Sequence, residues 1–386
     1  MAHVEAMSPV RLIAPMTSAE FWRGRRVFMT GHTGFIGGWL ALALWTRGAH
    51  VVGYALPPMT RPSLFEAIGL RDLVETEFAD VRDAAALRRS LEECSPSVVF
   101  HLAAQPLVRE AHSHPLTTFQ TNVMGTANLL DAVRSVRDVQ AAVVMTTDKV
   151  YANHEWAWPY READALGGHE PYGASKAAAE MAVAAWNGAY FANGGPAVVT
   201  VRAGNVIGGG DWSSDRVVPD AIRAFAAGEP LILRNPEAVR PWQHVMEPVG
   251  GLIRLAEHLV RHGATAAPAY NFGPPSDAVV AVRDLADHLA AAWGGNARWA
   301  HQPSGHPARE SNLLALDSSL ARTDLGWRPA WSLATTINKT AEWYRQHEAG
   351  AAMRTMTLQQ METYEDESHG RNRSSDETDS RIRHIA

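Results

Sequence analysis

A glycine-rich turn between a strand and a helix is the sequence feature that most constrains the fold of this chain. Residues 31–37 are Gly-His-Thr-Gly-Phe-Ile-Gly, and they join an apolar, β-branched run at 25–30 to a Leu- and Ala-rich run at 35–46. Glycines here permit a tight turn, let the backbone approach a pyrophosphate and allow the helix to pack closely on the strand. The motif predicts a dinucleotide-binding βα unit; a purely structural turn is the alternative.

Short apolar runs alternate with longer helical stretches as far as residue 206. The pattern predicts further strands at 49–54, 98–102, 141–146 and 197–202, and helices at 84–94, 116–136 and 172–191. Strands that alternate with helices are typical of parallel βαβ units. We therefore predict an α/β fold with a Rossmann-type doubly wound parallel sheet, followed by a smaller α+β substrate-binding domain. The 3-3 spacing of the glycines favours the nucleotide-binding fold of short-chain dehydrogenases and reductases.

The length of 386 residues is enough for two fused domains and a tail. We expect an N-terminal extension at 1–20, a nucleotide-binding domain at 21–207 plus about 242–273, and a substrate-binding domain at about 208–241 plus 274–347. Residues 351–386 are rich in Glu, Asp, Ser and Arg, with few large apolar residues after Tyr364, and predict a disordered tail.

Charge and cysteine content exclude several classes of protein. A net charge of −6 gives no general attraction for nucleic acid or anionic membranes. No apolar run approaches the roughly 20 residues of a membrane span. The single cysteine, Cys94, cannot form an intrachain disulfide, and we expect a cytoplasmic protein. The histidines show no metal-ligand spacing, so we expect no metal.

The adenosine side of the predicted cofactor site departs from the usual pattern. A carboxylate about 20 residues after the glycines normally binds the ribose of NAD, whereas residues 53–57 are Gly-Tyr-Ala-Leu-Pro. The nearby Arg61 suits a 2′-phosphate instead. Asp80, followed by Val81, is a candidate acceptor for the adenine amino group; a helix N-cap is an equal alternative.

Three residues form a predicted catalytic triad. Tyr172 and Lys176 are four residues apart, so both project from one face of a helix. An ammonium group beside a phenol lowers the pKa of the phenol, which allows tyrosinate to act as a base toward a hydroxyl group. Thr147 lies at the C-terminal end of a predicted strand, where catalytic groups of open α/β sheets gather.

Asp148 and Lys149 follow Thr147 directly. Interconversion of an alcohol and a ketone needs the triad alone, whereas elimination of water needs a further acid and base. The pair therefore favours dehydration over epimerisation. A surface salt bridge at the strand end is the alternative.

Five motifs together resemble one family. They are Thr-Gly-His-Thr-Gly-Phe at 30–35, His-Leu-Ala-Ala-Gln-Pro-Leu-Val-Arg at 101–109, Thr-Asp-Lys-Val-Tyr at 147–151, Arg-Ala-Gly-Asn-Val-Ile-Gly-Gly-Gly-Asp-Trp at 202–212 and Arg-Pro-Trp-Gln-His-Val at 240–245. From about residue 21 to 344 the chain resembles the CDP-glucose 4,6-dehydratase family of extended short-chain dehydrogenases/reductases. Members of that family also lack the ribose carboxylate, so the resemblance implies NAD in preference to NADP. Ile36 and Gly38 stand where many members have Lys and Ser.

The resemblance implies a reaction and a set of site residues. The expected reaction is NAD-dependent dehydration of CDP-glucose to CDP-4-keto-6-deoxyglucose, with Thr147, Asp148, Lys149, Tyr172 and Lys176 as the catalytic residues. The expected cofactor-binding residues are Gly31, Thr33, Gly34, Phe35, Ile36, Gly37, Asp80, Val81, Leu102, Ala103, Ala104, Tyr172 and Lys176. The expected substrate-binding residues are Gln105, Arg109, Asn205, Arg216 and Arg240, the last two for the diphosphate.

Other functions remain open on sequence grounds. One is a dehydratase acting on a different nucleotide sugar, or a 4-epimerase; a more distant one is a non-catalytic nucleotide-sensing relative, which the intact triad disfavours. By analogy with the family, the helices at 116–136 and 172–191 predict a homodimer with a four-helix interface.

Overall fold

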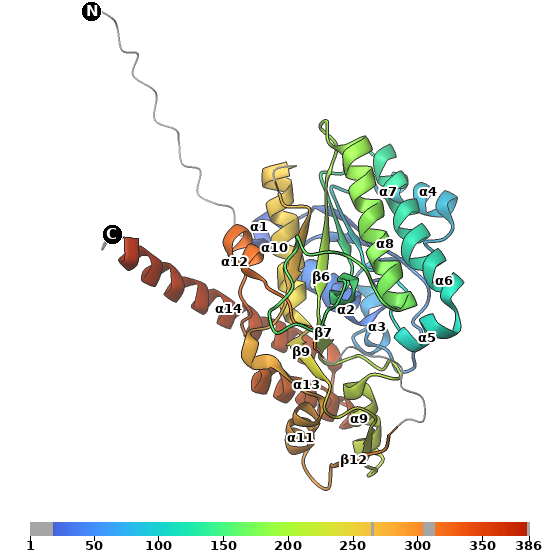
Figure 1. Cartoon of the computed structure of the whole chain (residues 1–386). Coiled ribbons are helices and arrows are strands. Elements are labelled where there is room, and N and C mark those ends of the chain that lie inside the picture. The colour runs from blue at the N-terminus through green and yellow to red at the C-terminus, as the bar shows by residue number, and fades with distance from the viewer. Residues whose placement is uncertain (1–17, 264–265, 304–312, 384–386) are drawn as a thin grey trace, which may run out of the picture.

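A seven-stranded parallel sheet forms the centre of the computed structural model (Figure 1). The structure describes residues 18–263, 266–303 and 313–383, with side chains as far as Ser368. The strand order is β10-β6-β5-β4-β1-β2-β3. The bounds are β1 Arg26–Thr30, β2 His50–Ala55, β3 Glu75–Phe78, β4 Val98–His101, β5 Ala141–Met145, β6 Ala197–Ala203 and β10 Ala269–Phe272. The predicted doubly wound sheet is confirmed, and the two edge strands β3 and β10 were not predicted.

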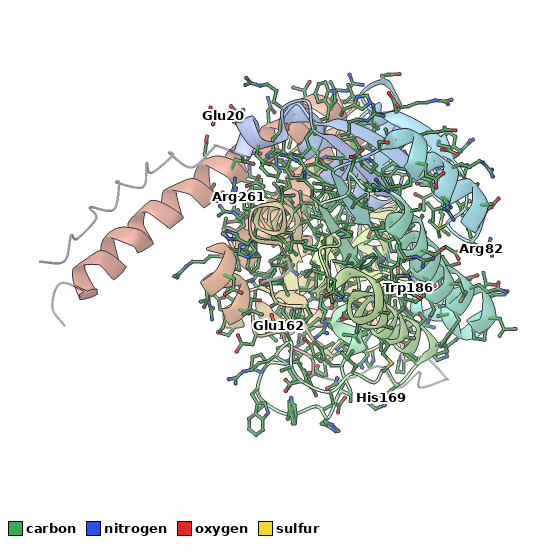
Figure 2. The ribbon with its side chains drawn as sticks, turned by 90° about the horizontal axis from the view of Figure 1, so that it is seen from above. Glu20, Arg82, Glu162, His169, Trp186 and Arg261 are labelled. Carbon is green, nitrogen blue, oxygen red and sulfur yellow. The ribbon has the colours of Figure 1, made fainter. Side chains whose placement is uncertain are left out.

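Helices cover both faces of the sheet because successive side chains of each strand point to opposite faces. Val27 and Met29 belong to the core shared with α2 (Phe35–Thr46) and α10 (Met246–His262). Phe28 belongs to a second core, shared with α4 (Ala84–Cys94), α7 (Gly125–Ser135) and α8 (Pro171–Trp186). In Figure 2, Arg82 before α4 and Arg261 on α10 accordingly lie on opposite sides of the molecule.

The two long predicted helices are continuous but contain π-helical turns. The stretch predicted at 116–136 consists of α6 (Pro115–Phe119), a π-helical turn at Gln120–Met124 and α7. Helix α8 likewise continues into a π-helical turn at Asn187–Phe191. Strand order reverses between β1 and β4, so the C-terminal ends of these strands open onto the crevice where such folds bind ligands.

Small sheets and helices follow β6, as expected for the second half of the chain. Their bounds are β7 Asn205–Ile207, α9 Val217–Ala226, β8 Leu231–Leu233, β9 Val239–His244, β11 Val279–Ala281, α11 Val282–Trp293, β12 Trp299–His301, α12 Ser319–Leu325 and α13 Leu333–Glu348. Strands β11, β9 and β7 form one sheet, and β12 and β8 another. Between these segments the chain returns to the main sheet through α10 and β10. The domain boundaries themselves stay a prediction.

The predicted disorder of residues 351–386 is wrong for the part of this segment that the structure describes. Helix α14 spans Met353–Arg383, and Met353, Met361 and Tyr364 are buried in the core. The Tyr364 hydroxyl donates to Glu247 at 2.7 Å, and the Trp343 indole donates to Thr357 at 2.9 Å. The polar composition concealed an apolar stripe at helical spacing. The predicted extension at 1–20 lies outside the described residues, except where α1 (Ser18–Trp22) begins.

Among the described helices, none is long and apolar enough to cross a membrane. The same residues contain no group of three or more His, Cys, Asp or Glu side chains placed to hold a metal ion.

Candidate active site

The turn between β1 and α2 forms a backbone cradle with no room for side chains at two of its glycines. Gly31 has a φ of +80°, and a Cβ atom there would lie 2.6 Å from the backbone nitrogen of Ala103. A Cβ atom on Gly37 would lie 2.1 Å from the carbonyl oxygen of Gly31. The N-cap of α2, Gly34, provides no side-chain cap for the first N–H groups. The cradle therefore fits the pyrophosphate of a dinucleotide.

The other residues predicted in this turn anchor it. The Thr33 hydroxyl donates to the carbonyl oxygen of Leu56 at 2.9 Å, which ties the turn to the end of β2. Phe35 and Ile36 pack against the main core, and the Phe35 ring lies close to Gly208.

The adenosine side contains an ion pair where the sequence suggested a free acceptor. Asp80 accepts from the backbone nitrogen of Arg82 at 2.9 Å and from its guanidinium group at 2.5 Å. These hydrogen bonds lower the pKa of Asp80. Asp80 caps no helix, because Asp83 is the N-cap of α4. Val81 is buried and packs against Gly125.

His32 is a site residue that the sequence analysis did not single out. Its ring fills the space beside Gly53 on β2, where a Cβ atom would lie 2.4 Å from the ring. Its Nε2 lies 3.1 Å from the Thr76 hydroxyl, whereas its buried Nδ1 has no partner among the described residues. Burial lowers the pKa of His32 to about 4. A neutral imidazole therefore lies at the edge of the cradle.

The end of β4 is fixed to the end of β1. The backbone nitrogens of Leu102 and Ala103 donate to the carbonyl and hydroxyl oxygens of Thr30, at 3.1 and 3.2 Å. His101 bridges Thr30 and Thr126 at 2.7 and 3.1 Å, and burial lowers its pKa to about 3. Leu102, Ala103 and the following Ala104 are only partly buried, beside the glycine cradle.

Gln105 supports its own loop. Its amide nitrogen donates to Leu107 O and to the Thr118 hydroxyl, at 3.1 and 2.8 Å, and its amide oxygen accepts from Leu107 N at 2.6 Å. The predicted contact of Gln105 with substrate thus competes with three internal hydrogen bonds.

A short 3-10 turn, Asp148–Val150, presents the acid–base pair after β5. Asp148 is 2% exposed; its Oδ1 accepts from the Thr147 hydroxyl at 3.1 Å and lies 3.7 Å from Lys149 Nζ. The other oxygen, Oδ2, is buried and has no partner among the described residues. Lys149 is about one third exposed. A buried carboxylate oxygen without a partner is costly, which makes a purely structural role for Asp148 a poor explanation.

Tyr172 and Lys176 lie in the first turns of α8, next to Thr147. Burial raises the pKa of Tyr172 to about 12, and a side-chain hydrogen bond with Thr147 and the charge of Arg216 oppose that rise. Lys176 donates to the carbonyl oxygen of Met145 at 2.8 Å, and burial lowers its pKa to about 8. Arg216 is the cation whose charge lowers the pKa of Tyr172, while the ammonium group of Lys176 is bound to the backbone of β5. The expected effect of Lys176 on the phenol stays a prediction.

Two of the predicted substrate arginines form ion pairs with aspartates of the segment 211–215. Arg216 binds Asp211 at 2.8 Å; burial alone would lower its pKa, but the charge and hydrogen bond of Asp211 raise it. Arg109, from α5 (Val108–Ser113), pairs with Asp215 at 2.9 Å. Asp215 directly precedes Arg216 in the chain, and the charge of Arg216 acts on Tyr172.

Asn205 and Arg240 lie on the neighbouring strands β7 and β9. Asn205 Oδ1 is buried without a partner among the described residues, as expected of a group that awaits a ligand. Arg240 is 9% exposed and donates to Val239 O at 2.9 Å. A Cβ atom on Gly204 would lie 2.8 Å from Pro241 and 3.4 Å from Asp148 Oδ2, so the start of β9 passes close to the acid.

A comparison with protein families now decides the relationship. The NAD dependent epimerase/dehydratase family matches residues 27–273. The chain belongs to this family. The match includes the glycine cradle, the acid–base pair and the Tyr-Lys pair of α8.

Curated relatives of this family member are nucleotide-sugar dehydratases. The chain is 44% identical over 354 residues to a CDP-glucose 4,6-dehydratase of Salmonella typhimurium, and the alignment covers 90% of this chain and 98% of the relative. It is 31% identical over 340 residues to a dTDP-glucose 4,6-dehydratase of Xanthomonas campestris, over 82% of this chain and 92% of the relative. The resemblance found in the sequence is confirmed.

Solved structures of related enzymes share the fold of this family member. The NAD-dependent NDP-hexosamine 5,6-dehydratase TunA, of tunicamycin biosynthesis, matches with a TM-score of 0.70 and 28% identity over 83% of this chain and 98% of its own. The dTDP-glucose 4,6-dehydratase DesIV from Streptomyces venezuelae, with NAD and TYD bound, matches with a TM-score of 0.71 and 25% identity over 84% and 98%.

Proposed function

We propose that this protein is a CDP-glucose 4,6-dehydratase that uses NAD. The observation that carries the proposal is the buried Asp148 with Lys149 beside it, next to Thr147 and Tyr172. An epimerase needs no such second acid and base, whereas a dehydratase does. The preference for cytidine rests on the 44% identical relative.

The glycine cradle and the residues after β3 and β4 suit the dinucleotide. Gly31, Gly34 and Gly37 admit the pyrophosphate, with Thr33, Phe35 and Ile36 in the same turn. Asp80 and Val81 lie toward the adenine, and Leu102, Ala103 and Ala104 line the path to Tyr172 and Lys176. When bound, NAD⁺ supplies the oxidation at C4 and the matching reduction at C6.

Tyr172 is the base for the C4 hydroxyl in this proposal. Thr147 and the positive charge of Arg216 favour the phenolate that receives this proton. Because the pKa of Tyr172 is about 12, only a small fraction of this side chain is ionised at neutral pH. That phenolate is a strong base and takes the C4 hydroxyl proton as C4 is oxidised.

Asp148 and Lys149 carry out the elimination. A 4-ketone acidifies the C5 proton; Lys149, or a water that it positions, removes this proton while Asp148 gives one to the departing C6 hydroxyl. Oδ1 of Asp148 lies 3.7 Å from Lys149 Nζ, so one proton can pass from Lys149 to Asp148 before the elimination. Over the cycle the protons balance: Tyr172 gains the C4 hydroxyl proton, Asp148 gives one to the leaving water, and Lys149 returns the C5 proton to C5 as hydride is added at C6.

Five arginine and amide side chains are proposed to hold the substrate. Arg216 and Arg240 suit the diphosphate, and Asn205 offers an unpartnered buried oxygen to a donor on the substrate. Gln105, on the loop after β4, and Arg109, on α5, are proposed to face the sugar. No metal takes part in this scheme.

The direct test is turnover of four nucleotide sugars. Purified protein is incubated with CDP-, dTDP-, UDP- and GDP-glucose, with and without added NAD⁺, and the 4-keto-6-deoxy product is measured. We expect product from CDP-glucose at the highest rate. Turnover of another nucleotide sugar alone would refute the specificity, and epimerisation without loss of water would refute dehydration.

We also propose a cytoplasmic homodimer. Exposed apolar side chains on the helices of the predicted interface support the dimer; they are Leu116, Phe119, Met124, Met181 and Tyr190. Sedimentation as a monomer at micromolar concentration would contradict the dimer. A single cysteine and an intracellular class of substrate support the location.

A further inference from the structure

A buried ion pair lies behind the catalytic residues. Arg202 on β6 binds Glu180 on α8 through two parallel hydrogen bonds, Nε to Oε1 at 2.8 Å and Nη2 to Oε2 at 2.7 Å, and each side chain is 4% exposed. The hydroxyls of Thr146 and Thr200 also donate to the carboxylate, at 2.6 and 2.8 Å. Buried ion pairs are often no more stabilising than apolar side chains of the same volume. Stability alone therefore does not account for this arrangement.

The pair holds both ends of the segment that carries the catalytic acid and base. Thr146, bound by Glu180, directly precedes Thr147. At the other end, Arg202 Nη1 donates to the Tyr151 hydroxyl at 2.8 Å, which in turn donates to Asn271 Oδ1 at 2.8 Å. Residues 147–150 thus lie between two anchors that meet in one ion pair. Glu162, labelled in Figure 2, extends the network by accepting from Asn271 N.

The same pair sets the position of α8 on β5. Tyr172, Lys176 and Glu180 are spaced by four residues and lie on successive turns of α8. Lys176 binds Met145 O and Glu180 binds Thr146, which are adjacent residues at the end of β5. Tyr172 forms a side-chain hydrogen bond with the next residue, Thr147. Three turns of α8 therefore contact three consecutive residues, 145–147, at the start of the catalytic segment.

Glu180 also acts on the charge of Lys176. Burial lowers the pKa of Lys176, and Glu180 raises it. The facing group on β4, His101, is neutral at working pH because its pKa is about 3. Arg202 on β6 pairs with the Glu180 carboxylate at 2.7 Å, and burial raises the pKa of Tyr172 to about 12. Glu180 is thus the anion that favours the ammonium form of Lys176.

We propose that Glu180 and Arg202 are positioning residues that align the Asp148-Lys149 pair with Tyr172 and Lys176. The proposal rests on the dehydratase function. It predicts that the pair governs the rate of the chemical steps and its pH dependence, and leaves substrate affinity largely unchanged.

The test compares Glu180→Gln, Arg202→Lys and the double variant Glu180→Gln/Arg202→Met. A misplacement of about 1 Å at a catalytic group costs about a hundredfold in rate, so we expect kcat to fall about a hundredfold in Glu180→Gln, with KM within about threefold. Without the negative charge, Lys176 loses its proton at lower pH, and the alkaline limb of kcat moves to lower pH. Arg202→Lys keeps the positive charge but loses the bidentate contact. The alkaline limb of kcat should therefore stay at the wild-type pH while kcat falls.

Glu257→Gln is the matched control. Glu257 on α10 is a buried carboxylate that accepts from Ser18 and Trp22 at 2.6 and 2.8 Å, away from the catalytic segment. Glu257→Gln is expected to lower the free energy of unfolding and to leave the alkaline limb of kcat unchanged. If a single variant does not fold, the double variant replaces it, because it leaves no lone buried charge.

Amide hydrogen exchange separates failure of this proposal from failure of the proposed function. In the Glu180 and Arg202 variants we expect faster exchange at residues 146–151 and little change in β1 and β4. This readout needs no substrate, so it remains valid even if the wild type converts no nucleotide sugar. Wild-type kcat and pH limb in Glu180→Gln, or unchanged exchange at 146–151, would overturn the positioning role.

Discussion

Replacing Asp148 by Asn should abolish activity and at the same time stabilise the fold. Asn matches the shape of Asp, and its amide oxygen can still accept from the Thr147 hydroxyl, which now lies 3.1 Å from Oδ1. It carries no charge for Lys149 at 3.7 Å and cannot give a proton to a leaving hydroxyl.

The burial of Asp148 sets the size of both effects. Its Oδ2 is buried without a partner among the described residues, and an unsatisfied buried polar group costs about 1–3 kcal/mol, more when it is charged. Asn puts an equally buried NH₂ group in the place of Oδ2, so only the extra cost of the charge is removed, and the free energy of unfolding should rise by about 1 kcal/mol. Loss of a general acid lowers kcat by about 10²- to 10⁴-fold, or about 3–5.5 kcal/mol in the barrier.

The assay uses CDP-glucose in D₂O with urea unfolding in parallel. In Asp148→Asn, oxidation at C4 and exchange of the C5 proton should continue while 4-keto-6-deoxy product fails to form. A fall in unfolding free energy together with lost activity would show that Asp148 acts structurally. Product formation near the wild-type rate would remove it from the mechanism.

Four further substitutions test other parts of the molecule. Tyr172→Phe should lower kcat by about 10²- to 10⁴-fold, with NAD⁺ affinity by calorimetry within a few-fold of wild type. Gly37→Ala puts a Cβ atom 2.1 Å from Gly31 O, so it should destabilise the fold by about 1–3 kcal/mol and weaken NAD⁺ binding at least about tenfold. Tyr364→Phe removes the hydroxyl that donates to Glu247, which should cost about 1.5–3 kcal/mol in urea unfolding and leave kcat unchanged. Burial lowers the pKa of His244 to about 3, so below about pH 6.5 the unfolded chain binds a proton that the folded chain does not. The free energy of unfolding should therefore fall, as the pH is lowered, by up to about 1.4 kcal/mol per pH unit, and His244→Phe should reduce that slope.

The central strands could be predicted because they carry their own signal. Residues 98–101 and 141–145 are continuous apolar runs, as expected of strands buried on both faces. The edge strand β3, Glu75–Phe78, is Glu-Thr-Glu-Phe and has no buried residue, so no apolar pattern marks it. Its partner β2 supplies the pairing, which sequence patterns alone do not reveal.

The shared helix of the proposed catalytic residues Tyr172 and Lys176 could be predicted from their spacing, but their electrostatics could not. Four-residue spacing placed Tyr172 and Lys176 on one face of α8. Which cation acts on the phenol depended on Arg216, which is 44 residues away in sequence and comes close to Tyr172 only in the folded chain. His32 was visible inside the glycine motif, yet its burial depends on the missing side chain of Gly53, a long-range packing effect.

The ion pair of Glu180 and Arg202 joins a residue whose position could be predicted from the sequence to one whose position could not. Glu180 lies four residues after Lys176, so its place on the catalytic face of α8 follows from the helix period. Its partner comes from a different strand and could be assigned only from the fold. Because that pair fixes both Thr146 and Tyr151, the geometry of the intervening acid and base depends on a contact outside their own segment. A substitution on β6 should therefore alter catalysis at the end of β5 without touching substrate or cofactor.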